Sequence, residues 1–249
     1  MHDQSEDRAG EQQASPARVA QIRANLTAVR EQIAAAARAA NRDPAEITLI
    51  AVTKTYPASD VRVLAELGVR DVGENRDQEA APKARATAGL GLRWHFIGQL
   101  QTNKAVSVAE YADYVHSVDR ARLVWALSKA AVRYDKELTC LVQVDLGNAG
   151  PMDDDTAARG GAHPDLIPAL AQAIAEAPGL KLGGLMAVAP LGADPAPAFE
   201  RLHGLAMSLR SDHPSATMIS AGMSGDMRQA VAAGATHVRI GSAILGIRQ

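Results

Sequence analysis

The chain has 249 residues, of which 47% are hydrophobic and only 3% aromatic, and its formal net charge is −2. So weak a net charge gives no basic field that would draw the protein to nucleic acid or to an anionic membrane. The single cysteine, Cys140, excludes an internal disulfide and a thiolate zinc site, and no stretch is apolar for long enough to span a bilayer.

The N-terminal residues 1–17 are polar and lack the hydrophobic stretch of a secretion signal. We expect a disordered tail over residues 1–17 and one domain over residues 18–249. The protein is therefore expected in the cytoplasm. A helix is predicted over residues 19–40, because apolar side chains recur on one face of it. These are Val19, Ile22, Leu26, Val29, Ile33 and Ala37.

Strand-like and helix-like segments alternate along the rest of the chain. Strands are predicted over residues 47–53, 69–75, 92–98, 114–118, 138–146, 180–188, 216–221 and 236–240. Helices are predicted between them over residues 59–67, 78–88, 103–110, 119–134, 165–177, 198–211 and 227–233. Ser59 or Asp60 is the expected cap of the first of these, and Asp119 of the fourth. This alternation predicts the α/β class and a single closed (β/α)8 TIM barrel rather than an open doubly wound sheet.

Lys54 directly follows the first predicted strand and precedes Pro57. The carboxyl ends of barrel strands form the ligand site of this fold, so Lys54 would lie at the mouth. A lysine amine can condense with an aldehyde once removal from water lowers its pKa. The alternative is a lysine that only extends into solvent, which is the better interpretation of a lone lysine.

Two segments rich in glycine and serine follow the last two predicted strands, at residues 220–227 and 239–242. Each leads from a strand towards a helix, where exposed backbone N–H groups bind phosphate and glycine lets the anion approach. Loops after strands seven and eight are the usual phosphate position of this fold. The alternative is that Ser224 and Asp226 only cap a helix, while Gly241 makes a turn.

Arg239 shares one face of the last predicted strand with His237. An arginine that points into a barrel needs an anion or a hydrogen-bond acceptor, although a surface ion pair is the alternative. Because guanidinium only donates, a pyridine nitrogen opposite Arg239 must stay unprotonated. A lysine for an aldehyde, a phosphate cup and a donor for a ring nitrogen together indicate pyridoxal 5′-phosphate (PLP).

The chain resembles the pyridoxal phosphate homeostasis protein family, whose members have alanine-racemase-like barrels. The matching segments are residues 51–54, 73–79, 94–104, 116–119, 183–186, 222–227 and 238–246. The resemblance implies a fold-type III PLP-binding barrel without the C-terminal β domain of racemases. It also implies that Lys54 holds PLP as an internal aldimine, that Ser224, Gly241 and Ser242 hold its phosphate, and that Arg239 faces its ring nitrogen. The complete expected cofactor-binding set is Lys54, Asn75, His95, Met223, Ser224, Arg239, Gly241 and Ser242.

Several of these residues also have a plainer interpretation. His95 is as well explained as a core histidine with satisfied hydrogen bonds, and Met223 as a packing residue. Residues 147–164 depart from the family pattern, and the aspartates 153–155 within them are best interpreted as a solvated loop. No metal site is predicted, because the histidines lack metal-ligand spacing.

The resemblance implies a cofactor carrier that acts in PLP homeostasis, with PLP-dependent apoenzymes as possible recipients. We expect no catalytic residues and no robust activity, and a monomer. The alternative is an amino-acid racemase, which needs a second proton-transfer group opposite Lys54. Barrel racemases take that tyrosine from a β-rich domain, and this chain ends at Gln249, shortly after the eighth strand. A sugar-phosphate isomerase would need a carboxylate base, for which Glu74 is the candidate.

Overall fold

The computed structural model describes residues 13–147 and 160–246. Within them, eight parallel strands pair in chain order, and the last pairs with the first, so that they form a closed barrel. The strands are β1 (Thr48–Val52), β2 (Asp71–Glu74), β3 (Arg93–Phe96), β4 (Tyr114–Val118), β5 (Leu138–Gln143), β6 (Leu180–Met186), β7 (Met218–Ser220) and β8 (His237–Ile240). This confirms the predicted (β/α)8 barrel.

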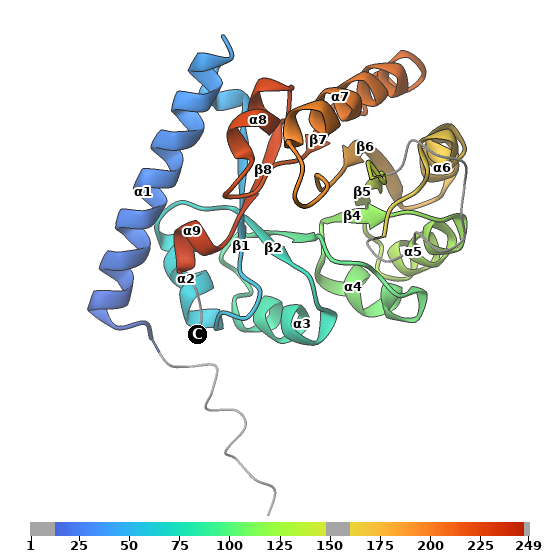
Figure 1. Cartoon of the computed structure of the whole chain (residues 1–249). Helices are drawn as coiled ribbons and strands as arrows, with labels where there is room; N and C mark the ends of the chain where they lie inside the picture. The colour runs from blue at the N-terminus through green and yellow to red at the C-terminus, as the bar shows by residue number, and fades with distance from the viewer. Residues whose placement is uncertain (1–12, 148–159, 247–249) are drawn as a thin grey trace, which may run out of the picture.

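Helices surround the strands on all sides (Figure 1). They are α1 (Pro16–Ala39), α2 (Ala58–Glu66), α3 (Asp77–Ala86), α4 (Ala105–Tyr111), α5 (Ala121–Arg133), α6 (Ile167–Glu176), α7 (Pro195–Asp212), α8 (Met227–Ala232) and α9 (Ser242–Leu245). The core lies between the strands and these helices and consists almost entirely of aliphatic side chains, as expected for strands covered on both faces. Cys140 is fully buried there, and burial raises the pKa of its thiol to about 12.

Helix α1 lies outside the ring and buries the apolar face that the sequence predicts, with Ile22, Leu26 and Val29 inside. Its start differs from the prediction. The Ser15 side chain accepts a hydrogen bond from the Arg18 N–H, and Pro16 occupies the first turn. Pro16 and Ala17 therefore belong to the helix and not to the tail expected over residues 1–17, of which residues 1–12 lie outside the described residues.

The expected helix caps were wrong in two places. Helix α2 begins after Pro57 without a side-chain cap, and Asp60 instead pairs with Arg18 of α1 at 2.6 Å. Helix α5 begins after Arg120, and Asp119 pairs with that arginine. The Arg18 guanidinium binds Asp60 through two N–H groups, and one N–H group of Arg120 binds Asp119, so each carboxylate is occupied by an arginine instead of by backbone N–H groups.

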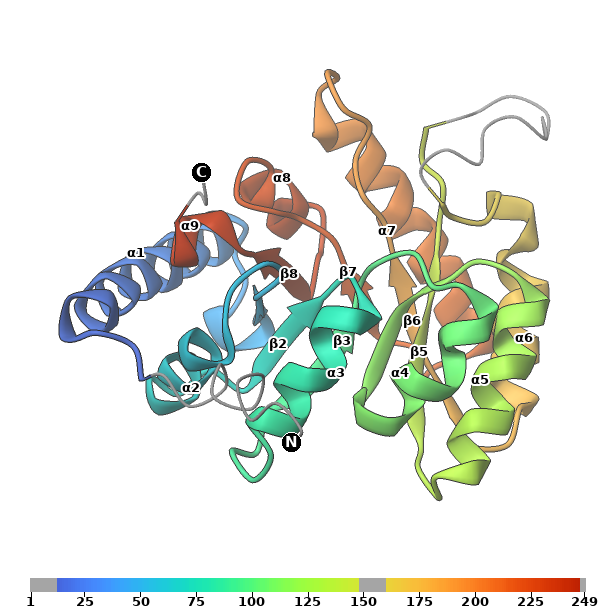
Figure 2. The same cartoon turned by 90° about the horizontal axis from the view of Figure 1, so that it is seen from below.

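Two further features bear on the ligand end of the barrel. The short helix α9 follows β8 directly and lies beside α1, as Figures 1 and 2 both show. The Asn25 side chain of α1 donates a hydrogen bond to the Ile244 carbonyl of α9 at 3.0 Å.

None of the helices in the described part of the chain is long and apolar enough to cross a membrane.

Candidate cofactor site

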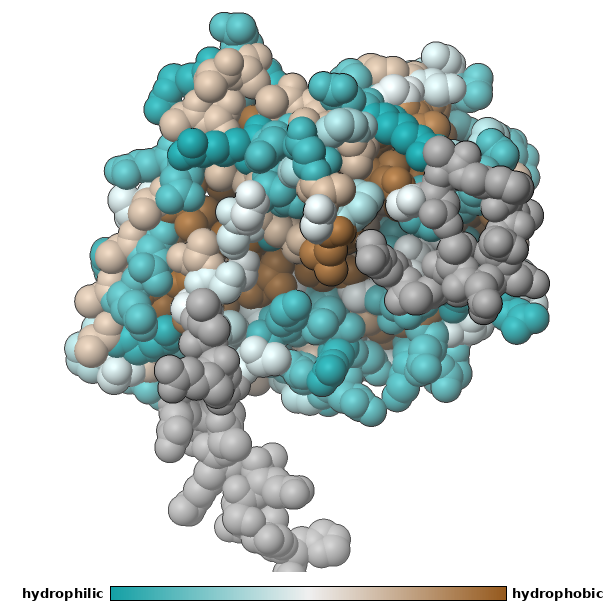
Figure 3. Space-filling model, in the orientation of Figure 1, coloured by the Kyte–Doolittle hydropathy of each residue, from teal (hydrophilic) through white to brown (hydrophobic). Residues whose placement is uncertain are grey.

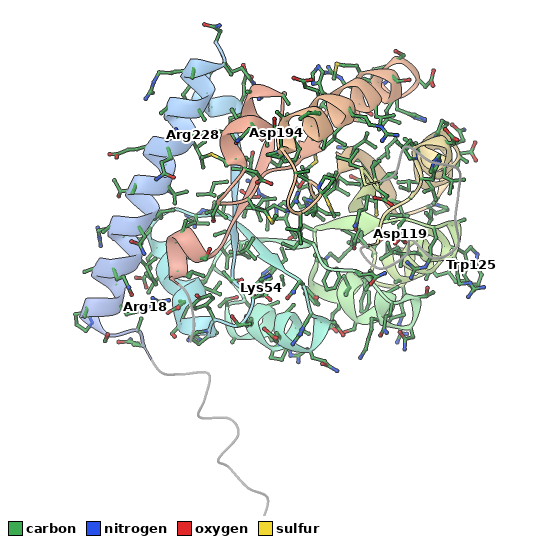
Figure 4. The ribbon with its side chains drawn as sticks, viewed as in Figure 1. Arg18, Lys54, Asp119, Trp125, Asp194 and Arg228 are labelled. Atoms are coloured by element: carbon green, nitrogen blue, oxygen red, sulfur yellow. The ribbon has the colours of Figure 1, made fainter. Side chains whose placement is uncertain are left out.

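Lys54 lies at the carboxyl end of β1, after the buried Thr53. Figure 4 shows it inside the ring of helices, between α9 and α3. Its side chain is exposed to water, so the residues around it do not bury the amine as predicted from the sequence. The next residue, Thr55, has a φ of 68°, and its N–H donates to Glu79 Oε2 at 2.8 Å. The bend that follows the lysine is therefore fixed by a carboxylate of α3.

Glu74, the residue that ends β2, is fully buried next to this bend. Its Oε1 accepts hydrogen bonds from Thr53 Oγ1 and from Lys83 Nζ, both at 2.7 Å. Its Oε2 has no hydrogen-bond partner among the described residues. Burial raises the pKa of Glu74 even though Lys83 is adjacent. A carboxylate bound in this way by an ammonium and a hydroxyl group has a structural role, which weakens the isomerase alternative.

The loop after β7 has room for an anion. Gly222 has a φ of 93°, a conformation that favours glycine, and its carbonyl accepts from the Arg239 N–H. The Met223 N–H donates to the carboxylate of Asp226 at 2.6 Å, so that amide is already occupied. Ser224 is exposed, and a Cβ added at Gly225 would meet nothing within 4 Å.

The junction between β8 and α9 lies next to this loop. Gly241 is the N-cap residue of α9, and Ser242 is the first residue of the helix and exposed. The first N–H groups of a helix have no partner within it, so those of Ser242 and Ala243 can bind an oxyanion. The two predicted phosphate-binding segments therefore sit at the ends of strands that are neighbours in the barrel.

Arg239 points into the barrel, as the alternation in β8 predicts, and is only 5% exposed. Its guanidinium donates to Ser220 Oγ at 2.7 Å and to the Ala187 carbonyl at 2.9 Å. Burial lowers the pKa of Arg239 to about 10, so the side chain is still a cation at neutral pH. Guanidinium has five N–H donors, and the two bonds leave others available for a ring nitrogen.

A chain of polar side chains continues from Ser220 across the barrel interior. His116 Nδ1 lies 3.0 Å from Ser220 Oγ, and His116 Nε2 lies 2.9 Å from His95 Nδ1. His95 Nε2 lies 2.9 Å from Asp71 Oδ1. Both ring nitrogens of His95 therefore already have protein partners, which supports its interpretation as a satisfied core histidine. The four residues come from β7, β4, β3 and β2.

Asn75 is half-buried beyond β2 and lines a hollow of about 170 Å³ together with Gln99 and Lys104. Its backbone is tightly packed against Gly98, where an added Cβ would lie 2.1 Å from the Asn75 carbonyl oxygen. Glycine at position 98 is thus required for the position of Asn75. Met223 is 38% exposed, and the other large apolar side chains exposed on loops after the strands are Val188 and Leu191. Figure 3 shows brown, apolar residues in the middle of the molecule inside a mostly teal, polar rim.

The chain matches the family described as alanine racemase, N-terminal domain, over residues 24–249. It is 41% identical over 255 residues to the pyridoxal phosphate homeostasis protein of Mycobacterium tuberculosis, which covers 95% of this chain and 96% of that protein. The protein with the same description from Escherichia coli is 40% identical over 230 residues, covering 90% of this chain and 95% of the other. The chain belongs to the pyridoxal phosphate homeostasis protein family. This confirms the resemblance seen in the sequence.

One similar solved structure has the cofactor in place. PipY of Synechococcus elongatus, determined with PLP bound, superposes with a TM-score of 0.77 at 32% sequence identity, covering 91% of this chain and all of PipY. Because the alignment covers the whole of PipY, this chain has a counterpart of the complete PipY barrel.

Asp71, Ser220 and Lys83 were not predicted as site residues. Ser220 and His116 lie in segments that the sequence indicated, but no role was predicted for either. A signal was present. Polar side chains in the middle or at the ends of buried strands are uncommon, and each must have a partner. What the sequence lacks is the pairing, because these partners are contributed by different strands and helices.

Proposed function

We propose that this protein binds PLP covalently through Lys54 and acts as a carrier in PLP homeostasis. The main observation in support of this proposal is that Lys54, Arg239 and the two glycine–serine segments lie at one end of the barrel in a chain of this family. PLP supplies an aldehyde that condenses with a primary amine and releases water. Lys54 would provide that amine, Ser224, Gly241 and Ser242 would hold the phosphate, and Arg239 would donate to the ring nitrogen.

The carrier role, rather than racemase activity, is supported by the tyrosines. Racemisation needs proton-transfer groups on both faces of the substrate carbon. Tyr56 is the tyrosine closest in sequence to Lys54, and its hydroxyl donates to the Gly246 carbonyl at 2.5 Å. Tyr114 stacks on His95 with the ring centroids 4.2 Å apart, at the amino end of β4. Neither hydroxyl is placed to serve as the second group.

The exposed lysine is also consistent with release of the cofactor. We propose that PLP passes from this mouth to PLP-dependent apoenzymes, and that the protein does so as a cytoplasmic monomer. An amine that remains accessible to water allows hydrolysis of the cofactor linkage, which a carrier requires and a deeply closed site would slow.

The test is the absorbance spectrum of the protein mixed with PLP, before and after borohydride reduction, followed by mapping of the modified peptide. The wild-type protein should show the absorbance of a protonated lysine–PLP linkage, and reduction should fix the cofactor on Lys54. Lys54→Ala should abolish both signals. The matched control is Lys104→Ala, since Lys104 also carries a solvent-accessible amine near the mouth.

Two results would overturn the proposal. If the Lys54→Ala variant were still modified by PLP to the same stoichiometry as the wild-type protein, the linkage would lie on another residue. Turnover of D- or L-alanine by the wild-type protein at ordinary enzyme rates would establish a racemase in place of a carrier.

A further inference from the structure

A buried row of hydrogen bonds runs through the barrel from Arg239 to Asp71, and the chemistry of its two ends, together with the neutral state of its two histidines, sets the direction of its bonds. At one end, the Arg239 guanidinium donates to Ser220 Oγ. At the other end, Asp71 accepts from Arg93 through both carboxylate oxygens, at 2.8 and 2.6 Å. Arginine can only donate, and an ionised carboxylate can only accept.

The intermediate protons follow from this. Since Arg239 donates to Ser220 Oγ, the hydroxyl hydrogen of Ser220 is free to donate onward to His116 Nδ1. His116 then carries its hydrogen on Nε2 and donates to His95 Nδ1. His95 in turn carries its hydrogen on Nε2 and donates to Asp71. With Asp71 ionised and both rings neutral, each histidine is in the Nε2–H tautomer. The reversed row would need a doubly protonated His95, which the burial of that ring disfavours.

The electrostatics agree with these assignments. Burial, reinforced by the neighbouring His95 and Arg239, lowers the pKa of His116 well below its usual value. Burial also lowers the pKa of His95, although Asp71 and the more distant Asp113 oppose that effect while Arg93 adds to it. Burial raises the pKa of Asp71, but hydrogen bonds from His95 and Arg93 outweigh it, so the net shift is downward and the carboxylate is ionised. His237, whose pKa is lowered to about 4 by burial, adds no charge at neutral pH.

We infer that Ser220, His116, His95 and Asp71 are positioning residues for Arg239. They hold its guanidinium in place through a row of hydrogen bonds that ends on an ionised carboxylate. A neutral hydroxyl, rather than a carboxylate, is therefore the neighbour of Arg239 on the inner side. Arg239 thus remains a cation and a strong donor at the position where the proposed function places the ring nitrogen, and Asp226 is the carboxylate that acts on its charge. The inference rests on that proposed function only for the identity of the ligand.

The far end of the row is remote from the mouth. Asp71 is the first residue of β2, and the Arg93 side chain that binds it is 53% exposed. Both line a hollow of about 530 Å³ at the amino end of the barrel. A change at Asp71 can therefore reach a bound cofactor only through the barrel interior.

The first test needs no cofactor. Nitrogen-15 NMR of histidine-labelled protein should show the rings of His95 and His116 unprotonated at Nδ1 and protonated at Nε2, with no titration between about pH 6 and pH 8. The two rings are assigned by loss of their signals in His95→Asn and His116→Asn. A doubly protonated ring, or an Nδ1–H tautomer at either position, would overturn the inference whatever the protein binds.

The second test uses the PLP-loaded protein and the pH midpoint of its absorbance change. Asp71→Asn removes the ionised end of the row, so Arg239 should be held less firmly and donate less well to the ring nitrogen, and the midpoint should rise by about 0.5 pH unit or more. The matched control is Asp60→Asn, which also breaks a buried carboxylate–arginine pair but lies in α2, outside the row. Equal midpoints in Asp71→Asn and the wild type, or equal shifts in both variants, would contradict the inference.

A parallel pair of variants covers the case in which Asp71→Asn does not fold. Ser220→Ala breaks the row beside Arg239 and should raise the midpoint, while Ser220→Thr keeps a hydroxyl and should restore it. An unchanged midpoint in Ser220→Ala would also sink the inference. Absence of any lysine–PLP absorbance in the wild-type protein would instead refute the proposed function and leave the NMR result as the test of the row.

Discussion

Arg239 and Glu74 are both buried and charged, and their charges are balanced in different ways. Glu74 binds Lys83 directly, and the Lys83 ammonium also donates to the Thr53 carbonyl at 2.8 Å. Arg239 binds neutral groups directly, and the carboxylate that acts on its charge is Asp226. A buried ion is costly unless a partner compensates it, so removing one partner costs more than the pair contributes. The Glu74 pair is therefore the more sensitive point for stability.

Lys83→Met should destabilise the protein by about 3 kcal/mol or more. Methionine keeps most of the apolar stem but leaves the Glu74 carboxylate buried without its cation. Urea unfolding at neutral pH measures the effect. Lys104→Met is the matched control, because the Lys104 ammonium lies 3.9 Å from Asp77 on a side chain that is 40% exposed, and such pairs contribute at most about 1 kcal/mol.

Combining Lys83→Met with Glu74→Gln should recover much of the lost stability, since the uncompensated charge is then gone. If Lys83→Met cost no more than Lys104→Met, the Glu74–Lys83 contact would not be an essential ion pair.

Helix α1 connects the outside of the barrel to the proposed phosphate site. It packs against Ile244 and Leu245 of α9, and Asn25 binds the Ile244 carbonyl. A helix of four residues has little stability of its own. The position of Ser242 at its start thus depends on a helix that is far away in sequence.

Asn25→Ala should weaken PLP binding about 5-fold, which corresponds to about 1 kcal/mol for one lost hydrogen bond. Absorbance titration of the apoprotein with PLP gives the affinity. Thr27→Ala is the control within the same helix, because the Thr27 hydroxyl binds only the Arg23 carbonyl one turn earlier on an exposed face. Equal affinities of Asn25→Ala and Thr27→Ala would show that α1 does not position α9.

The sequence predicts elements better than it predicts their contacts. The number and order of strands, the buried face of α1 and the inward direction of Arg239 follow from periodicity, which is a local property. The expected cap of α2 was wrong because Asp60 binds Arg18, which lies 42 residues away. The row from Arg239 to Asp71 could not be predicted either, since its residues meet only after the barrel closes.

The whole barrel interior should respond to acid through its buried histidines. Their pKa values are lowered by burial, so the unfolded chain takes up protons first. Stability from these groups is fully present above about pH 6.5 and is lost as the pH falls through their folded pKa values. For His237, a shift from 6.5 to about 4 corresponds to at most about 3 kcal/mol.

We therefore expect the free energy of unfolding, measured by urea denaturation, to fall between about pH 6.5 and pH 5, by up to about 1.4 kcal/mol per pH unit for each such histidine. The raised pKa of Glu74 acts in the opposite direction, since its contribution is lost as the pH rises above its usual value of 4.5. His237→Asn should make the acid dependence shallower. Stability that is constant between these pH values would contradict the assignment of neutral, buried histidines.

Thr55 adopts an unfavourable backbone conformation directly after Lys54. A β-branched residue with a φ of 68° is unfavourable by about 1–3 kcal/mol, and a glycine would relieve that cost. Selection for heat resistance alone would therefore replace Thr55 with glycine. The backbone that positions the neighbouring Lys54 amine would then be more flexible. On the proposed function, a variant selected for heat resistance with glycine at position 55 would therefore bind an aldehyde less well through Lys54.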